Sequence, residues 1–548
     1  MCAGSTLNGQ HEQDSLAAGS LSLPPAPAQP VVAFQYTGDY RIDTLLPGVG
    51  TLTGLSALQY RWNYPGALGS HATVTYSFMT AKPTYGGTDD GQGDFGFSQF
   101  NAQQKAAVRE IMGHLQAELG ITLTEVQVDT ATNYGQIRLG NNHQGFVSGA
   151  YTFLPNSTFD PDLGGDVWVN QDSSVNTNPV AGNYGWETLV HEIGHALGLK
   201  HPGNYNAGSA PSTDPGNFLG VKEDNTDYTV MSYRDGPTNP SSTTSGNRDW
   251  YGMYDLLTLK TLYGDNSSYN AGDTPYKFQN SDGGKLEIID DASGYDTIDL
   301  SSLTLGATVD MRPGGFSSVG VRAGGIGAVN NLSIDLSTII EKFIGTPFND
   351  TVTGNDANNT FVLGLGANTA DGGAGIDTAV YTISRSAAQV SDSGGLVHVI
   401  APGIIDTLTQ TERVEFADGK LAFDLNGDAG TTAKVIGAVF GPNAVAAHPD
   451  YAGIGLSLLA GGMSYSTLVQ YALDARLGPV HDSSQVVSLL YSNVTGVQPS
   501  TALSSQYRAP LDSKTETEAD LGIFAADHPL NVANINLVGL AQTGLVYV

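Results

Sequence analysis

The sequence predicts an α+β fold that is followed by a parallel β-roll and a small helical C-terminal domain. Strand and helix periods mix up to about residue 265, and short turn-rich Gly/Asp units follow up to about residue 425. Longer helical patterns return after that point. We therefore expect a flexible leader (1–45), an α+β domain (46–265), the roll (266–425) and the helical domain (426–548).

The composition limits the classes of function. The 548 residues include 23 basic and 54 acidic side chains, a formal net charge of −31. This charge argues against nucleic acid or an anionic membrane as the main partner and suits a protein that binds hard cations, although solubility alone would also explain it. The single cysteine, Cys2, excludes an internal disulfide. No stretch approaches the ~20 apolar residues of a membrane span, and the Pro-rich start lacks the pattern of a Sec-type signal peptide.

The α+β domain shows both periods clearly. "TVTYSF" alternates apolar and polar residues as a strand does, and "ITLTEVQV" and "QIRL" are further predicted strands. An amphipathic helix is predicted between a cap at Asn101 and a stop at Gly120. Its apolar face consists of Val108, Ile111, Met112, Leu115 and Leu119.

The string "HEIGHALGLKH", from His191 to His201, predicts a metal site. Residues four apart share one face of a helix, so His191 and His195 can bind one ion, and Glu192 is turned ~100° to flank it. A continuing helix would point His201 away from that ion. We therefore expect Gly198 to end the helix in the left-handed conformation and a returning strand to carry His201.

Three neutral imidazoles around zinc leave a position open for water, and Glu192 is placed to take that water's proton. A structural zinc site usually has four cysteine or histidine ligands, and a chance set of surface histidines is the other alternative. An apolar stripe is expected to anchor the helix to the core. It consists of Trp186, Leu189, Val190, Ile193 and Leu197.

The same string is the metzincin signature H-E-x-x-H-x-x-G-x-x-H, and "TVMSYRD" supplies the methionine turn, with Met231 expected beneath the metal. Together they resemble the serralysins, which are secreted bacterial zinc proteases. "GAYTFLPN", "DLGGDVWVN", "HPGNYNAG" and "LYGDN" extend the likeness over roughly residues 40–385. The resemblance implies a metzincin-type zincin domain with one catalytic zinc and Tyr233 as a further ligand that can stabilise the oxyanion. It also implies that a peptide pairs in extended form with Gly149, Ala150, Tyr151 and Thr152.

Serralysins carry a calcium-filled β-roll, and Gly372 to Val380 fits the repeat G-G-x-G-x-D-x-U-x. Turn carbonyls and a carboxylate are hard ligands that suit several Ca²⁺ ions. By resemblance, one site uses Asn270, Gly272, Thr274, Asp291, Ser293 and Asp296, and a second uses Gly294, Asp296, the Ile339 carbonyl and Glu341. Within the roll the ligands are Thr346, Phe348, Asp350, Gly372, Ala374 and Asp377, with Gly373 and Gly375 facing the next turn. "LGLGANTAD" has lost an aspartate, so we expect fewer ions than a full roll holds, and a plain solvated loop is the alternative for any single turn.

These features predict a secreted, extracellular zinc endopeptidase that calcium stabilises. The resemblance implies protein or peptide substrates, a proteinaceous inhibitor and a type I exporter that reads a C-terminal signal. The leader is expected to act as a short propeptide. Two alternatives stay open: a calcium-dependent surface or adhesion protein with an idle zinc site, and a protease that its helical tail narrows to one surface-layer or host protein.

Overall fold

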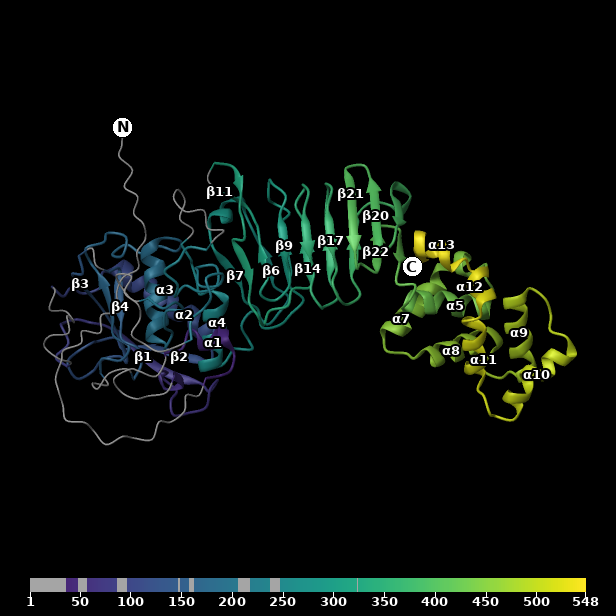
Figure 1. Cartoon of the computed structure of the whole chain (residues 1–548), viewed down its shortest axis with the longest axis horizontal. Coiled ribbons are helices and arrows are strands. Elements are labelled where there is room, and N and C mark those ends of the chain that lie inside the picture. Colours follow the sequence, from purple (N-terminus) through teal and green to yellow (C-terminus); the bar gives the residue numbers. More distant parts are fainter. Residues whose placement is uncertain are drawn as a thin grey trace. The chain divides into compact units, whose positions relative to one another are not determined.

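The structure is a computed structural model that describes residues 36–47, 57–85, 96–145, 148–156, 162–205, 217–236, 247–322 and 324–548. It consists of two compact units (Figure 1). The first contains residues 1–274, 278–296 and 313–339, and the second contains residues 275–277, 297–312 and 340–548.

The first unit is built on a five-stranded sheet with the order β2-β1-β3-β5-β4. All neighbouring strands are parallel except β4, which lies at one edge and runs antiparallel to β5. The sheet shares one hydrophobic core with the helices α2, α3 and α4. The elements are α1 (Tyr40–Asp43), η1 (Ala57–Gln59), β1 (Ala72–Phe78), α2 (Ala102–Glu118), β2 (Ile121–Glu125), β3 (Ile137–Asn142), β4 (Ala150–Thr152), β5 (Val167–Asn170), α3 (Tyr184–Ala196) and α4 (Met253–Tyr263).

The predicted elements of this unit are present where the sequence placed them. Asn101 caps α2 and forms a capping box with Gln104, because the Asn101 carboxamide accepts from the Gln104 N–H and the Gln104 side chain accepts from the Asn101 N–H. The predicted stripe of α3 is buried over its whole length, from Trp186 to Leu197. The three predicted strands are β1, β2 and β3.

The predicted leader is too long. Its first 35 residues lie outside the described residues, so its role as a propeptide is not described. The part that follows belongs to the core of the first unit: Asp39 caps α1, and Leu45 and Leu46 are fully buried. Ile42, Leu45 and Leu46, which the prediction assigned to the leader, therefore join the core instead.

The first unit also extends beyond the predicted boundary at residue 265. It includes η3 (Asn280–Gly284), β7 (Glu287–Ile289), β10 (Phe316–Ser317), β11 (Val321–Arg322), β12 (Ile326–Gly327) and β13 (Leu332–Ile334). Lys260 of α4 connects them to the preceding helix, because its ammonium donates to Asp290 at 2.6 Å and lies 3.5 Å from Asp335. The boundary at residue 265 was predicted from a change in amino-acid composition, which does not reveal this buried ion-pair network.

The second unit begins with a parallel β-roll, as predicted. Strands β14 to β18 start at residues 342, 351, 360, 369 and 378, and successive strands alternate between an eight-stranded and a six-stranded sheet. The middle residue of each triplet is buried, so the side chains of Phe343, Val352 and Phe361 fill the space between the sheets. The roll comprises β6 (Pro275–Lys277), β8 (Thr297–Asp299), β9 (Thr308–Asp310), β14 (Lys342–Ile344), β15 (Thr351–Thr353), β16 (Thr360–Val362), β17 (Thr369–Asp371), β18 (Thr378–Val380), η4 (Arg385–Ala387), β19 (Gln389–Asp392), β20 (Leu396–Ala401), β21 (Ile404–Thr409), β22 (Arg413–Phe416) and β23 (Gly419–Ala422).

The last part of the second unit is helical, as predicted, but the chain ends in a strand. Leu545–Tyr547 form β24, which pairs antiparallel with β23 at the end of the eight-stranded sheet. The apolar terminal residues are therefore part of the fold in this structure. The helices are α5 (Asp428–Phe440), α6 (Ala444–Ala447), α7 (Pro449–Ala460), α8 (Tyr465–Leu477), α9 (Ser483–Thr495), α10 (Thr501–Asp512), α11 (Glu518–Ala526), α12 (Pro529–Asn534) and α13 (Leu537–Thr543).

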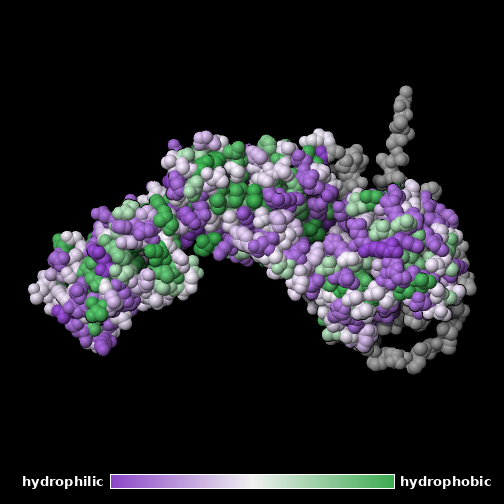
Figure 2. All heavy atoms as spheres, turned by 180° about the vertical axis from the view of Figure 1, so that it is seen from behind, coloured by the Kyte–Doolittle hydropathy of each residue, from purple (hydrophilic) through white to green (hydrophobic). Residues whose placement is uncertain are grey.

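Large apolar side chains are also exposed on the second unit. Leu396, Ile400 and Ile405 on β20 and β21 are among them, and Figure 2 shows hydrophobic atoms gathered among hydrophilic ones on one face of the molecule. Within the described ranges, no helix combines the length and apolarity needed to cross a membrane.

Candidate metal centre and active site

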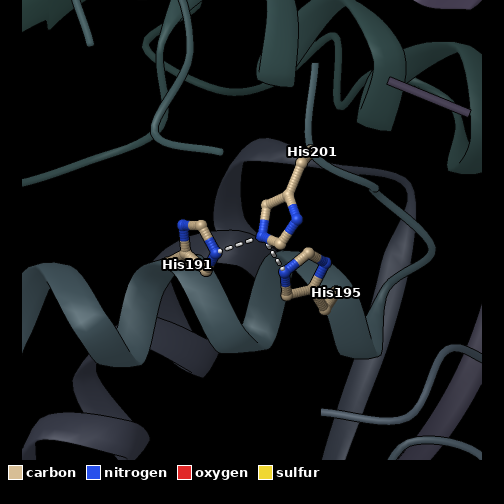
Figure 3. Close-up of side chains that lie close together, drawn as sticks. All are labelled: His191, His195 and His201. Carbon is tan, nitrogen blue, oxygen red and sulfur yellow. Dashed lines mark hydrogen bonds between the residues drawn. The ribbon is translucent and has the colours of Figure 1, made fainter. Parts of the chain in front are cut away.

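Three histidines of the first unit converge on one point (Figure 3). The Nε2 atom of His201 lies 3.2 Å from Nε2 of His191 and 3.1 Å from Nε2 of His195. All three side chains are buried, and their ligand atoms lie within 4.8 Å of one another. Among the described residues, this is the cluster of three His, Cys, Asp or Glu side chains that is close enough to share a metal ion.

The end of α3 directs His201 to the other two histidines. The helix stops at Ala196, and Gly198 takes a φ of +107°, as the spacing predicted. Two features exclude a side chain at this position. The positive φ strains any residue with a Cβ, and that Cβ would come within 2.1 Å of the Tyr60 carbonyl oxygen. The predicted returning strand is wrong, because His201 lies in an irregular segment. The reversal at Gly198 alone is enough to bring it back.

Main-chain carbonyls hold two of the imidazoles. Nδ1 of His191 lies 2.8 Å from the Val230 carbonyl oxygen, and Nδ1 of His195 lies 2.7 Å from that of Leu199. Each Nδ1 must therefore carry the proton, so each Nε2 offers a lone pair to a metal. Burial lowers the pKa of His191 to about 3 and that of His195 to about 4, which keeps both rings neutral at physiological pH. The donor set thus fits zinc, which prefers neutral imidazoles.

Glu192 follows His191 in α3 and is buried. The Thr152 hydroxyl of strand β4 donates a hydrogen bond of 2.6 Å to its Oε2. Bonds of this kind to a carboxylate are short and strong. The predicted general base is therefore connected directly to the edge strand of the sheet.

The predicted methionine turn lies against α3. Met231 is fully buried, and its main-chain N–H donates to the Thr229 hydroxyl at 3.0 Å. Two residues later, the Tyr233 ring has its centroid 4.4 Å from that of His201 and stacks on Tyr205 at 5.0 Å. Tyr233 is thus close enough to the cluster for its predicted part in the site.

The main-chain hydrogen bonds of the predicted substrate strand, β4, alternate in direction. Gly149 accepts from Asn170 and Phe153 donates to Asp166, both towards β5. In an antiparallel pair every second residue bonds to the same neighbour, so Ala150 and Thr152 direct their main-chain groups away from β5. Because β4 is the last strand of this sheet among the described residues, a peptide could extend the sheet there.

Four of the residues predicted for the first calcium site, Asn270, Gly272, Thr274 and Asp296, are in contact within the first unit, and the site itself stays a prediction. The Thr274 hydroxyl contacts the carbonyl oxygens of Asn270 and Gly272, and the Thr274 N–H donates to Asp296. Asp291, five residues before Asp296 in the sequence, is also buried, and it accepts from the Ser293 N–H. Carbonyls and buried carboxylates in this arrangement fit Ca²⁺. In the second predicted site, Gly294 and Ile339 belong to the first unit and Glu341 to the second, and the site stays a prediction.

One turn of the roll fits calcium well. Asp377 is fully buried, and its Oδ2 has no hydrogen-bond partner among the described residues. Burial, together with Glu412 and Asp371, raises its pKa to about 7. Gly373 and Gly375, flanking Ala374, take positive φ values and lie against the carbonyl oxygens of the preceding turn. The other oxygen, Oδ1, accepts from the Asn359 N–H at 2.6 Å. A buried carboxylate oxygen without a donor beside aligned carbonyls is an environment that a cation would stabilise.

The turn before it does not fit. At Asn359, 18 residues before Asp377, the carboxamide Nδ2 donates to the Ile340 carbonyl at 3.0 Å. The Nδ2 of Asn355 donates to the same carbonyl at 2.7 Å and to that of Met311 at 3.1 Å. Neutral amide donors thus occupy the carbonyl lone pairs that an ion would use.

On the other side of the roll, Asn368 likewise stands where an aspartate was expected, and its Nδ2 donates to Asp406 at 2.9 Å. Asp350, 18 residues earlier, already accepts from the N–H and hydroxyl of Thr346 and from the Ala307 N–H. Phe348 lies in the turn of Asp350, and Gly372 begins the turn of Asp377. The lost aspartate seen in the sequence therefore has a structural replacement.

Two contributions to the site were missed from the sequence. The carboxylate of Asp255, at the start of α4, accepts from the Thr229 hydroxyl and from the N–H groups of Val230 and Gly252. It therefore fixes the turn whose carbonyl holds His191. The position of Asp255 three residues after Gly252 marks a helix start in the sequence, but nothing there connects it to Thr229. The hydroxyl contact of Thr152 with Glu192 was also missed.

Comparison with known proteins agrees with this geometry. A model of the family described as Peptidase M10 serralysin C terminal matches residues 254–405. Serralysin of Proteus mirabilis is 34% identical over 324 residues, which are 55% of this chain and 62% of that protein. Metallopeptidase AprA of Pseudomonas marginalis is 34% identical over 52% of this chain and 61% of its own. Serralysin A of Dickeya chrysanthemi is 31% identical over 53% and 60%.

The solved structure of myroilysin superposes on 37% of this chain with 16% identity and a TM-score of 0.22, which is too low to support an argument. The three matching regions span about three fifths of the length of the curated relatives. The α+β unit with its three-histidine centre, followed by the β-roll, has the features of a metalloprotein with a histidine-bound ion. Over the matched ranges, the chain is similar to the serralysins.

Proposed function

We propose that this protein is a zinc-dependent endopeptidase that hydrolyses peptide bonds in extracellular proteins. The observation that carries the proposal is the convergence of the His191, His195 and His201 Nε2 atoms on one point, with the buried Glu192 adjacent to His191 in α3. Three neutral imidazoles next to a carboxylate are the donor set of a catalytic zinc site. The relatives named serralysin and metallopeptidase support the same activity.

The three imidazoles would hold one zinc ion, which supplies Lewis-acid chemistry by lowering the pKa of a water molecule and polarising a carbonyl. Glu192 would accept a proton from the attacking water and later deliver it to the leaving amine. The Tyr233 hydroxyl would donate a hydrogen bond to the oxyanion. Ala150 and Thr152 would align the peptide by pairing with its main chain, which places the scissile bond beside Glu192.

The test is the variant Glu192→Gln, which keeps the size of the side chain and cannot accept the proton. We expect a full zinc content by metal mass spectrometry, with casein cleavage reduced by about a thousandfold or more. We also expect the parent to lose its activity on zinc chelation and to regain it when zinc is added. Equal cleavage by the variant and the parent would refute the mechanism.

Calcium and secretion belong to the same proposal. Several Ca²⁺ ions would bind at the turns of Asp296 and Asp377, and the acidic chain, with its net charge of −31, would fold fully where calcium is abundant. We further propose export by a type I exporter and control by a proteinaceous inhibitor, on the basis of the similarity to serralysins. Calcium-induced folding, monitored by circular dichroism, tests the first part. Recovery of intact protein from culture medium only when an exporter is present tests the second.

A further inference from the structure

The hydrogen bond between Thr152 and Glu192 has a consequence for catalysis. Strand β4 alternates, so that Ala150 and Thr152 are buried and Tyr151 between them is partly exposed. This alternation points the Thr152 side chain to α3 while its main-chain groups face the outer edge of the sheet. One residue therefore offers its backbone to a peptide and its hydroxyl to the carboxylate.

Resting on the proposed function, we propose that Thr152 is a positioning residue that couples substrate pairing to the orientation of the general base. Its hydroxyl donates to Oε2 at 2.6 Å, and both residues are only 6% exposed. A bond shielded from water restrains rotation of the carboxylate about its Cγ–Cδ bond, so the oxygens keep a fixed direction relative to the imidazoles.

Substrate pairing and base orientation are coupled because the paired backbone and the hydroxyl belong to the same residue, Thr152. A peptide that pairs with β4 restrains the Thr152 backbone, and a β-branched side chain in a strand has few χ1 rotamers. The hydroxyl position is therefore fixed more tightly when the peptide is bound, and the carboxylate is fixed with it. Alignment of this kind acts on kcat more than on KM, because it concerns the reacting groups and leaves the main-chain pairing unchanged.

Three variants test the proposal. Thr152→Val keeps the shape and the strand propensity but removes the hydroxyl, and Thr152→Ser keeps the hydroxyl. We expect kcat of Thr152→Val on a peptide substrate to fall about tenfold or more, with KM changed less than about twofold. Thr152→Ser should recover most of kcat. Thr124→Val, at an exposed position of β2 on the opposite edge of the sheet, is the matched control and should behave as the parent.

Two readouts do not depend on activity. Zinc content should equal that of the parent in every variant, and a crystal structure of Thr152→Val should show the Glu192 carboxylate rotated or in several orientations. An unchanged carboxylate, an undiminished kcat of Thr152→Val, or a serine variant as slow as the valine variant would overturn the proposal. A parent without zinc-dependent cleavage would instead refute the proposed function, and the carboxylate orientation would still test the positioning role.

Discussion

The thioether sulfur of Met231 lies against Gly194 on the catalytic helix, where a Cβ would come within 2.9 Å of Sδ. Gly194 lies between His191 and His195 in the sequence, so its missing side chain lets the methionine turn approach the helix directly beneath the two histidines. The Tyr251 ring would be 3.2 Å from the same Cβ. This glycine is therefore required by packing and not by its backbone angles.

Gly194→Ala should crowd Met231 and Tyr251 and lower the free energy of unfolding by about 1–3 kcal/mol. We also expect weaker zinc retention during dialysis against a chelator. The control is Gly113→Ala in α2, where a Cβ meets no atom within 4 Å. That variant should be more stable than the parent by up to about 1 kcal/mol. Equal behaviour of the two variants in denaturant titrations would contradict the packing role of Gly194.

Asp255→Asn tests the support of the methionine turn. The native carboxylate accepts from the hydroxyl of Thr229 and the N–H groups of Val230 and Gly252 at 2.5–2.8 Å. An asparagine has one acceptor oxygen, and its amide would face donors, so we expect a loss of about 2–4 kcal/mol and lower zinc occupancy. Asp235→Asn, at an exposed position, should change neither quantity. Full zinc occupancy in Asp255→Asn would show that the turn holds His191 without this carboxylate.

The pH dependence of stability should reveal the calcium turn. Burial raises the pKa of Asp377 to about 7 and that of Asp406 to about 6, both above the value of an unfolded chain. The folded state then binds these protons more tightly, so its extra stability is complete below about pH 4 and is lost as pH rises through 6 to 7. In excess chelator we expect the second unit to lose roughly 1–3 kcal/mol between pH 5 and pH 8.

Calorimetry measures this loss of stability. Hydrogen exchange in β15–β17 assigns the transition to the second unit. Added calcium should abolish most of it, because the ion neutralises the carboxylates. Asp377→Asn should flatten the profile, and Asp356→Asn, at an exposed position of the preceding turn, should not. A second unit whose stability in chelator does not change with pH would contradict the assignment.

The asparagine-closed turn predicts a gain of calcium on substitution. In Asn359→Asp the amide donor to the Ile340 carbonyl is replaced by a carboxylate, which leaves carbonyl lone pairs available for an ion. We expect one additional Ca²⁺ per chain by metal mass spectrometry, and a lower melting temperature than the parent in chelator. Asn358→Asp, an exposed neighbour, should leave the calcium count unchanged. An unchanged count in Asn359→Asp would show that the turn excludes the ion for another reason.

The sequence alone determined the helix of the metal site, the reversal at Gly198 and the order of α+β fold, roll and helical tail. These features depend on local spacing: helix periodicity, the tolerance of glycine for positive φ and the nine-residue repeat. Other features depend on contacts between residues far apart in the sequence, and only the tertiary structure decided them. It buried residues 42–46, moved the end of the first unit beyond residue 265 through Lys260, and set Asp255 against the methionine turn. It also brought the Thr152 hydroxyl to Glu192, because only the folded sheet and helix place residues 40 positions apart within 2.6 Å. A local sequence pattern does not predict such pairs, because packing between helices and strands determines which distant residues come into contact.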